Sequence, residues 1–418
     1  MLQSLLPKAH PKFRALPLLG SVADGFDDWL SANGYTPGSR KFSIRFLRRA
    51  DADFRKRGVR NIADLSRAIL YDSWRSLIRR FPNEAGTVRT LARYLNSAGI
   101  IQTGAIEATR SVSPATLVTD EYADHLRNVR GCAPSTISHH RLASRCFLED
   151  LGASGNSLES LQPCHIEAYI TKAGQRLCRA SLQHEIAAIR GLLRFLSTDG
   201  RVRAGLDRQI DTPRLYRLEQ LPRSLPWNTV TALLKSINTK SAMGLRDYAM
   251  FLLIATYGLR ASEVVALSLD DIHWRQGSLR ILQRKTSSPL ELPLTNEVCA
   301  ALTKHLRRTP PVAPCRRVFL RMRAPVGLLK PTAVTEAFQA LVRKSGLEIP
   351  FQCPHCLRHS FAVHLLRSGT PLKAIGDILG HRTAESTSVY LRLATGDLRE
   401  VSLPVPAQRK SAARGAKR

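Results

Sequence analysis

The spacing of apolar residues in the first half of the chain predicts helices. From residue 22 onward, apolar positions recur every three or four residues, which is the period of an amphipathic helix. This pattern predicts helices over 39–57, 122–126, 135–148, 165–173 and 181–196, and a shorter element at 62–65. Ser135 is placed to act as the N-cap of the third of these helices.

The second half of the chain adds two strands to a helical pattern. Alternating apolar residues at 278–283 and 290–294, separated by a short turn, predict an antiparallel hairpin. Helices are predicted at 227–237, 245–257, 261–267, 296–307, 332–345, 358–368, 372–379 and from 384 to Tyr390. The expected fold class is therefore mainly α with a small antiparallel β-sheet.

Two helical stretches share a spacing of 96 or 97 residues. The matching pairs are Phe26 and Tyr122, Leu30 and Leu126, Pro37 and Pro134, and Leu65 and Leu161. One interpretation is a duplicated helical module. The other is that two helical bundles share a generic helix–turn spacing.

Composition suggests the domain boundaries. Glycines and prolines among arginines between residues 199 and 225 are typical of an extended basic linker. We expect an N-terminal helical region at 1–110, a second helical domain at 111–200, the linker at 201–225 and a C-terminal domain at 226–403. The basic stretch at 404–418 is expected to be a disordered tail.

The charge of the chain favours a polyanionic partner. Sixty-three Lys and Arg face 33 Asp and Glu, a formal net charge of +30, which indicates binding to nucleic acid. A role of the charge in solubility, or an association with ribosomes, is the alternative. The sequence has neither a long apolar span nor a secretory signal pattern, so we expect a cytoplasmic protein that does not bind membranes.

The eight cysteines do not form a metal-binding pattern. They are scattered along the chain, which fits a reducing compartment. Cys353 and Cys356 form a CxxC pair, but a second ligand pair at suitable spacing is missing. We therefore expect no metal site.

Four short segments carry the residues needed to break a DNA phosphodiester without metal or ATP. That reaction requires a nucleophile, cations for the non-bridging oxygens and an acid for the leaving oxygen. The segments are LRASE, with Arg260 followed by Glu263 on the same helix face; the hairpin turn, with Lys285; HCLRH, with His355, Arg358 and His359; and a stretch in which His381 precedes Tyr390 by nine residues.

These segments resemble the motifs of the tyrosine recombinases, also called phage integrases. LRASE resembles the family's first arginine box, KTSSPLELPL its lysine hairpin, HCLRH its HxLRH box and LGH its LGH box. The resemblance is close over 225–403 and weaker over 114–200, which resembles the family's SAM-like core-binding domain. At Lys285 the sequence departs from the family, because Thr286 replaces the usual glycine and Arg284 is adjacent.

The resemblance implies a role for each residue. Tyr390 would attack phosphorus and form a 3′-phosphotyrosine, while Arg260, oriented by Glu263, and Arg358 would hold the non-bridging oxygens, for which a guanidinium is well suited. The remaining expected roles are proton donation to the leaving 5′-hydroxyl by Lys285, assistance to proton transfer by His355, a phosphate hydrogen bond from His381 and a structural role for His359. No cofactor is implied.

The expected function is site-specific recombination of double-stranded DNA, for integration, excision or transposition of a mobile element. The resemblance implies a homo-tetramer on DNA or an assembly with related recombinases, with the stretch after Tyr390, through Leu398 to Leu403, docking on a neighbouring subunit. Two alternatives remain open: DNA relaxation by a type IB topoisomerase, and a catalytically silent protein that keeps only DNA binding.

Overall fold

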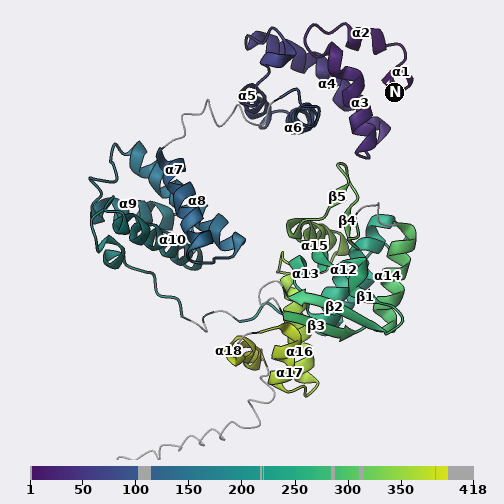
Figure 1. The fold of residues 1–418 in the computed structure, drawn as a ribbon. Helices are drawn as coiled ribbons and strands as arrows, with labels where there is room; N and C mark the ends of the chain where they lie inside the picture. The colour runs from purple at the N-terminus through teal and green to yellow at the C-terminus, as the bar shows by residue number, and fades with distance from the viewer. Residues whose placement is uncertain are drawn as a thin grey trace, which may run out of the picture. The chain divides into compact units, whose positions relative to one another are not determined.

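The protein consists of two compact units. The computed structural model describes residues 2–101, 114–216, 219, 221–283, 288–309, 315–381 and 383–393. One unit comprises Met1–Ala32 and Thr36–Glu219, and the other comprises Asn33–Tyr35 and Gln220–Arg418. Both units are helical and the second also contains a small antiparallel sheet (Figure 1), which confirms the predicted fold class. The predicted tail at 404–418 and residues 394–403 of the predicted docking stretch lie outside the described residues.

The first unit begins with a helical bundle that ends near Ile101. Phe26, Leu30, Phe54, Leu91 and Leu95 are fully buried in it. The Thr36 and Ser66 side chains cap the helices α4 and α5. The bundle comprises α1 (Leu2–Leu5), α2 (His10–Arg14), η1 (Gly20–Val22), α3 (Ala23–Ala32), α4 (Pro37–Lys56), η2 (Ile62–Asp64), α5 (Arg67–Leu77) and α6 (Pro82–Ser97).

A second bundle of the same unit has its own hydrophobic core. It comprises α7 (Pro114–Asn128), α8 (Pro134–Ala153), α9 (Pro163–Gly174), α10 (Arg179–Thr198) and η3 (Leu206–Gln209). Its core continues through Val202 and Leu206 to Ile210, within the range expected to be an extended linker. The prediction that Ser135 caps a helix is wrong: α8 starts one residue earlier, at Pro134, and its N-cap is Ala133. Proline is favoured at that first position because its missing N–H would be unpaired there.

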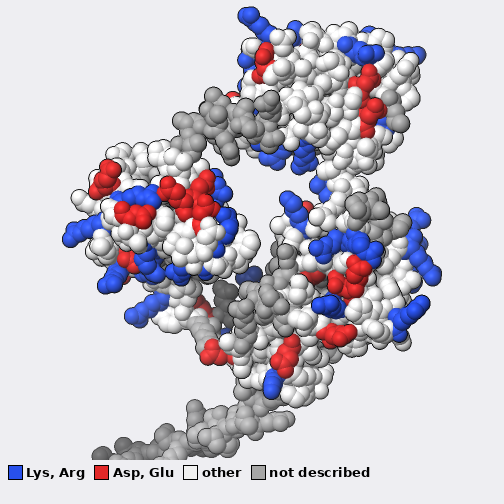
Figure 2. Space-filling model, viewed as in Figure 1, with Lys and Arg blue, Asp and Glu red and all other residues white. Residues whose placement is uncertain are grey.

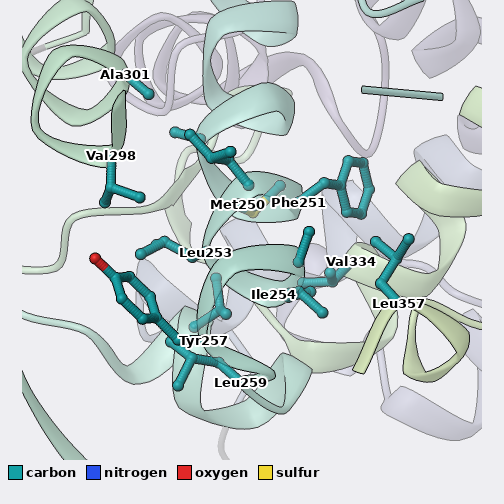
Figure 3. Close-up of a cluster of buried hydrophobic side chains, with 14 of the residues drawn as sticks. Met250, Phe251, Leu253, Ile254, Tyr257, Leu259, Val298, Ala301, Val334 and Leu357 are labelled. Carbon is teal, nitrogen blue, oxygen red and sulfur yellow. The ribbon is translucent and has the colours of Figure 1, made fainter. Parts of the chain in front are cut away.

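The second unit is built around an apolar helix. Almost every residue from Ala249 to Tyr257 is buried, and this segment packs against side chains such as Val298, Val334 and Leu357 from other helices (Figure 3). The helices of the unit are α11 (Trp227–Lys235), α12 (Ala242–Tyr257), α13 (Ala261–Ala266), η4 (Leu269–Asp271), α14 (Asn296–Arg308), α15 (Pro331–Ser345), α16 (His355–Arg367), α17 (Leu372–Leu379), α18 (Ala384–Ser388) and η5 (Val389–Leu393). None of the described helices is long and apolar enough to cross a membrane.

The predicted hairpin forms the main part of the sheet. Strands β1 (Ile272–His273), β2 (Ser278–Gln283) and β3 (Ser288–Pro293) pair in that order, all antiparallel. Leu279 lies opposite Leu292 and Ile281 opposite Leu290, and burial alternates along β2, so one face of the hairpin joins the core. A separate pair is formed by β4 (Leu320–Arg321) and β5 (Gly327–Leu328).

Candidate active site

Arg260 is held at the start of a helix by a buried carboxylate. It is the N-cap residue of α13, and its backbone N–H donates to Glu263 Oε2 over 2.7 Å. Its guanidinium Nη1 donates to the other carboxylate oxygen over 2.8 Å. Because Glu263 is 3% exposed, the carboxylate is fixed by the protein core and restricts how the guanidinium can turn.

The turn that precedes Arg260 requires a glycine. Gly258 ends α12 in the left-handed region, with φ of 64°. A Cβ at this position would lie 2.6 Å from a Leu379 methyl carbon and 2.8 Å from the Phe361 ring. The absence of a side chain therefore lets this turn lie directly against α16 and α17, which carry other predicted site residues.

Arg358 lies deep in the same cluster. It is 3% exposed, and its two terminal nitrogens donate to the carbonyl oxygens of Gly258 and Leu379. Burial, together with the nearby charge of Arg260, lowers the pKa of Arg358 to about 10. Arg358 is therefore still protonated near neutral pH, as a buried cation held by two carbonyl dipoles.

Tyr390 points into this cluster. Its side chain is 2% exposed, and its hydroxyl lies 3.0 Å from His359 Nδ1. Burial raises the pKa of the Tyr390 phenol, and the positive charges of Arg358 and Arg260 oppose that rise. The predicted helix ends before this residue, because α18 stops at Ser388 and Tyr390 lies in the 3-10 turn η5.

The other two predicted histidines also lie around Tyr390. The His381 ring stacks near the phenol, with centroids 6.4 Å apart and planes at 13°, and its Nδ1 is hydrogen-bonded to the Thr387 hydroxyl over 2.8 Å. The His355 ring meets His359 edge-on at 4.5 Å. The structure thus gathers Arg260, His355, Arg358, His381 and Tyr390, while Lys285 lies outside the described residues.

His359 is part of the cluster, although the sequence suggested only a structural role for it. Burial, together with the neighbouring charges of His355 and Arg358, lowers the pKa of His359 to about 4. The imidazole is therefore neutral near pH 7 and faces the phenol. In the sequence, only the position of His359 directly after Arg358 in the HCLRH segment indicated that it lies near the site. That position does not predict a contact with Tyr390.

The CxxC pair does not lie in a group of metal ligands. Cys356 is buried, and burial raises the pKa of its thiol to about 12, whereas a metal ligand has to be a thiolate. Among the described residues, no group of three or more His, Cys, Asp or Glu side chains is arranged to hold a metal ion.

A cluster of two guanidinium groups, three imidazoles and a phenol defines a class of protein that acts on phosphate esters. Family comparisons agree with this chemistry. The model of the phage integrase family matches residues 223–396, and the model of the N-terminal SAM-like domain of phage integrases matches residues 119–200.

Relatives extend the similarity along the chain. A putative integrase/recombinase, y4rA, of Sinorhizobium fredii is 30% identical over 92% of this chain and 93% of its own length. The tyrosine recombinase XerD of Listeria monocytogenes is 30% identical over 65% of this chain and 92% of its own length. The chain therefore belongs to the phage integrase family of tyrosine recombinases, and its activity is site-specific DNA recombination.

Solved structures share the fold. A lambda integrase dimer bound to a COC′ core site matches with a TM-score of 0.52 and 18% identity, over 66% of this chain and 94% of that one. The Tn1549 transposon integrase in complex with a circular intermediate DNA matches with a TM-score of 0.52 and 17% identity, over 68% and 99% of the two chains.

Proposed function

We propose that this recombinase cuts and rejoins DNA through a covalent 3′-phosphotyrosine at Tyr390. The observation that carries this proposal is the position of the Tyr390 hydroxyl, which is hydrogen-bonded to His359 and lies within the electrostatic influence of Arg358 and Arg260. The phenolic oxygen attacks phosphorus, the bond to the 5′-bridging oxygen breaks, and the phosphoryl group stays on the enzyme. Attack by the 5′-hydroxyl of a second strand reverses these steps and releases Tyr390.

The two arginines are assigned to the non-bridging oxygens of the scissile phosphate. Both are held by contacts that limit reorganisation: Arg260 by Glu263, and Arg358 by two carbonyl oxygens. Preorganised cations of this kind stabilise charge that develops in the transition state, by roughly 3 kcal/mol for each donor. His381, whose ring is fixed by Thr387, adds a hydrogen bond to the same phosphate.

Proton transfer is assigned to the remaining groups. The phenolic proton is assigned to His359, whose Nδ1 lies 3.0 Å from the Tyr390 hydroxyl. His355, in ring contact with His359, assists this transfer. Lys285 is assigned as the acid that protonates the leaving 5′-oxygen, on the basis of its motif.

We further propose that the protein serves a mobile element and acts as a homo-tetramer on DNA or together with related recombinases. The support is its similarity to y4rA and to the Tn1549 transposon integrase. We assign residues 226–403 to the catalytic domain and 111–200 to the core-binding domain, in line with the two family matches.

Trapping the covalent intermediate tests the chemistry. Nicked duplexes that carry the DNA flanking the gene lose a short fragment after cleavage, so that strand rejoining fails and the adduct accumulates. We expect an adduct with the wild type and none with Tyr390→Phe. Tyr248→Phe is the matched control, because its phenol bonds Glu297 outside the cluster, and this variant should form the adduct as the wild type does.

Two results would contradict the proposal. If no flanking sequence yields an adduct with the wild type, the chain only binds DNA. If the adduct forms but two marked duplexes never exchange strands while supercoiled DNA is relaxed, the protein acts as a topoisomerase.

A further inference from the structure

The two bundles of the first unit bury residues in the same register. Every buried residue of α7 has a buried counterpart 96 positions earlier, in or directly before α3. The pairs are Val22 and Val118, Ala23 and Thr119, Phe26 and Tyr122, Asp27 and Ala123, and Leu30 and Leu126. A helix of the first bundle therefore presents the same face to its core as its counterpart in the second.

Most buried residues of the later helices also have buried counterparts, although Ile44 is buried and its counterpart Arg141 is exposed. Between α4 and α8 the offset is 97, which pairs Phe46 with Ala143, Leu47 with Ser144, Ala50 with Phe147, Asp51 with Leu148, and Phe54 with Leu151. Between α6 and α10 the offset is 101, which pairs Ala85 with Ile186, Val88 with Ile189, Leu91 with Leu192, and Leu95 with Leu196. A left-handed glycine follows both last helices, Gly99 with φ of 69° and Gly200 with φ of 68°.

An aromatic pair marks the same place in both cores. The rings of Phe26 and Tyr94 lie 5.4 Å apart at 42°, and those of Tyr122 and Phe195, at the equivalent positions, lie 5.5 Å apart at 34°. In the first bundle Tyr94 carries the hydroxyl, and in the second bundle Tyr122, at the position equivalent to Phe26, carries it. Each hydroxyl lies where a glycine leaves room: a Cβ on Gly25 would meet Tyr94 Oη at 2.3 Å, and a Cβ on Gly191 would meet Tyr122 Oη at 2.2 Å.

Generic helix–turn spacing does not account for this agreement, because it leaves the buried face, the ring pair and the final glycine unspecified. These features support a relation between the first bundle and the second, which the SAM-like family model matches at 119–200. The offset grows from 96 to 101 along the chain, so the spacing that the sequence shows up to Leu65 is not kept in the last helix.

Charge separates the two copies. Residues 22–101 contain fifteen Lys and Arg against eight Asp and Glu, a net charge of +7, whereas the equivalent residues 118–202 contain ten against nine, a net charge of +1. On the face drawn in Figure 2, the second bundle shows acidic side chains among its basic ones. The first copy therefore attracts polyanions more strongly than the second.

One helix face of the first copy concentrates this charge. Lys41, Arg45 and Arg48 follow one another at intervals of four and three along α4, so they share one face, and all three are exposed. In the described part of the chain none of them forms a salt bridge, whereas other arginines of the bundle do. At the equivalent places α8 carries Ser138, Leu142 and Arg145.

We propose that the first bundle is a second SAM-like domain and that its α4 face of Lys41, Arg45 and Arg48 binds the phosphate backbone of duplex DNA. The choice of DNA rests on the proposed function. The contacts carry no sequence information, since phosphate contacts position the protein without reading the base edges. This domain therefore increases the affinity of the protein for the DNA that the second bundle and the catalytic unit bind.

The salt dependence of binding tests this proposal. The probe is a random-sequence duplex, and the dissociation constant of the full-length protein is measured over a range of KCl concentrations. Each phosphate contact contributes about 0.9 to the slope of log affinity against log salt. We therefore expect Lys41→Gln/Arg45→Gln/Arg48→Gln to lower the slope by about 2 to 3.

A control variant removes the same number of charges from exposed salt bridges. Arg127, Arg141 and Arg316 each pair with an exposed aspartate, so changing all three to Gln should alter the slope by less than the α4 variant does. Thermal unfolding of both variants should match the wild type, because the six side chains are exposed.

The proposal is overturned if the α4 variant keeps the wild-type slope, or if it keeps DNA affinity but loses self-association measured by light scattering. In the latter case the face binds a second copy of the chain. Neither outcome depends on adduct formation. If only the proposed Tyr390 chemistry is wrong, the wild type forms no adduct, but the α4 variant still shows a lower salt slope than the wild type.

Discussion

The two units of this protein use cationic side chains in opposite ways. In the second unit Arg358 is 3% exposed and held by two backbone carbonyls. In the first unit Lys41, Arg45 and Arg48 are exposed on a helix, without salt bridges in the described residues. Arg358 is thus held rigidly out of water, whereas the three cations of α4 lie on the surface.

This difference corresponds to two functions of positive charge, transition-state stabilisation and attraction to the DNA backbone. Stabilising a transition state requires charges that are already oriented and poorly screened, because reorganisation during the reaction would cost free energy. Attraction to a DNA backbone needs only many accessible charges, each contributing a little through counterion release. Single substitutions should therefore have large effects in the second unit and small ones in the first.

The largest effect is expected from Arg358→Lys. Lysine keeps the charge but cannot donate to Gly258, Leu379 and a phosphate with the geometry of a guanidinium. We expect the single-turnover rate of adduct formation to fall by about 10² to 10³-fold, the loss typical of one transition-state donor. Arg316→Lys, at an exposed pair with Asp270, should cleave at the wild-type rate. Equal rates for both variants would show that the buried guanidinium of Arg358 is no more important for cleavage than an exposed one.

A smaller effect is expected from His359→Gln. Glutamine can still hydrogen-bond the Tyr390 hydroxyl but is a poor proton acceptor, so adduct formation should slow by about 10²-fold. The loss should shrink as the pH rises, because the phenol then ionises without help. A purely structural His359 would instead give a loss that does not vary with pH.

The same residue makes a prediction about stability. The pKa of His359 is about 4 in the folded protein, below the ordinary value of about 6.5. Between about pH 4 and pH 6.5, the unfolded chain therefore binds a proton at this histidine more readily than the folded protein does. Acidification through this window should therefore lower the free energy of unfolding of the wild type. Chemical denaturation at pH 7 and pH 5 should show a smaller decrease in His359→Gln.

The smallest effect is expected from one surface cation. Arg45→Gln should reduce the salt slope of DNA binding by about 0.9 and leave the rate of cleavage at saturating protein unchanged. Arg127→Gln, taken from a surface salt bridge with Asp124, is its control. A large loss of cleavage in Arg45→Gln would show that the first unit does more than bind backbone.

The predicted elements were most accurate where the apolar period is clear. Helices α4, α10, α12 and α17 and strand β2 formed at or within a few residues of the predicted positions. Helices α5 and α6 went unpredicted because polar and small side chains on their buried faces, such as Ser73, Thr87 and Thr90, hide the period. The two-residue strands β4 and β5 exist only through pairing with each other, and local sequence does not encode such pairing.

By itself, the sequence determined the chemical types: the excess of positive charge, the order of the site motifs and the helical period that places Glu263 one turn after Arg260. Only the tertiary structure decided that Arg358 donates to the Gly258 carbonyl, that His359 bonds Tyr390, and which residues the two bundles of the first unit bury. Helical period and charge depend on neighbouring residues, whereas burial, pKa and the meeting of distant side chains depend on packing between segments far apart in the chain.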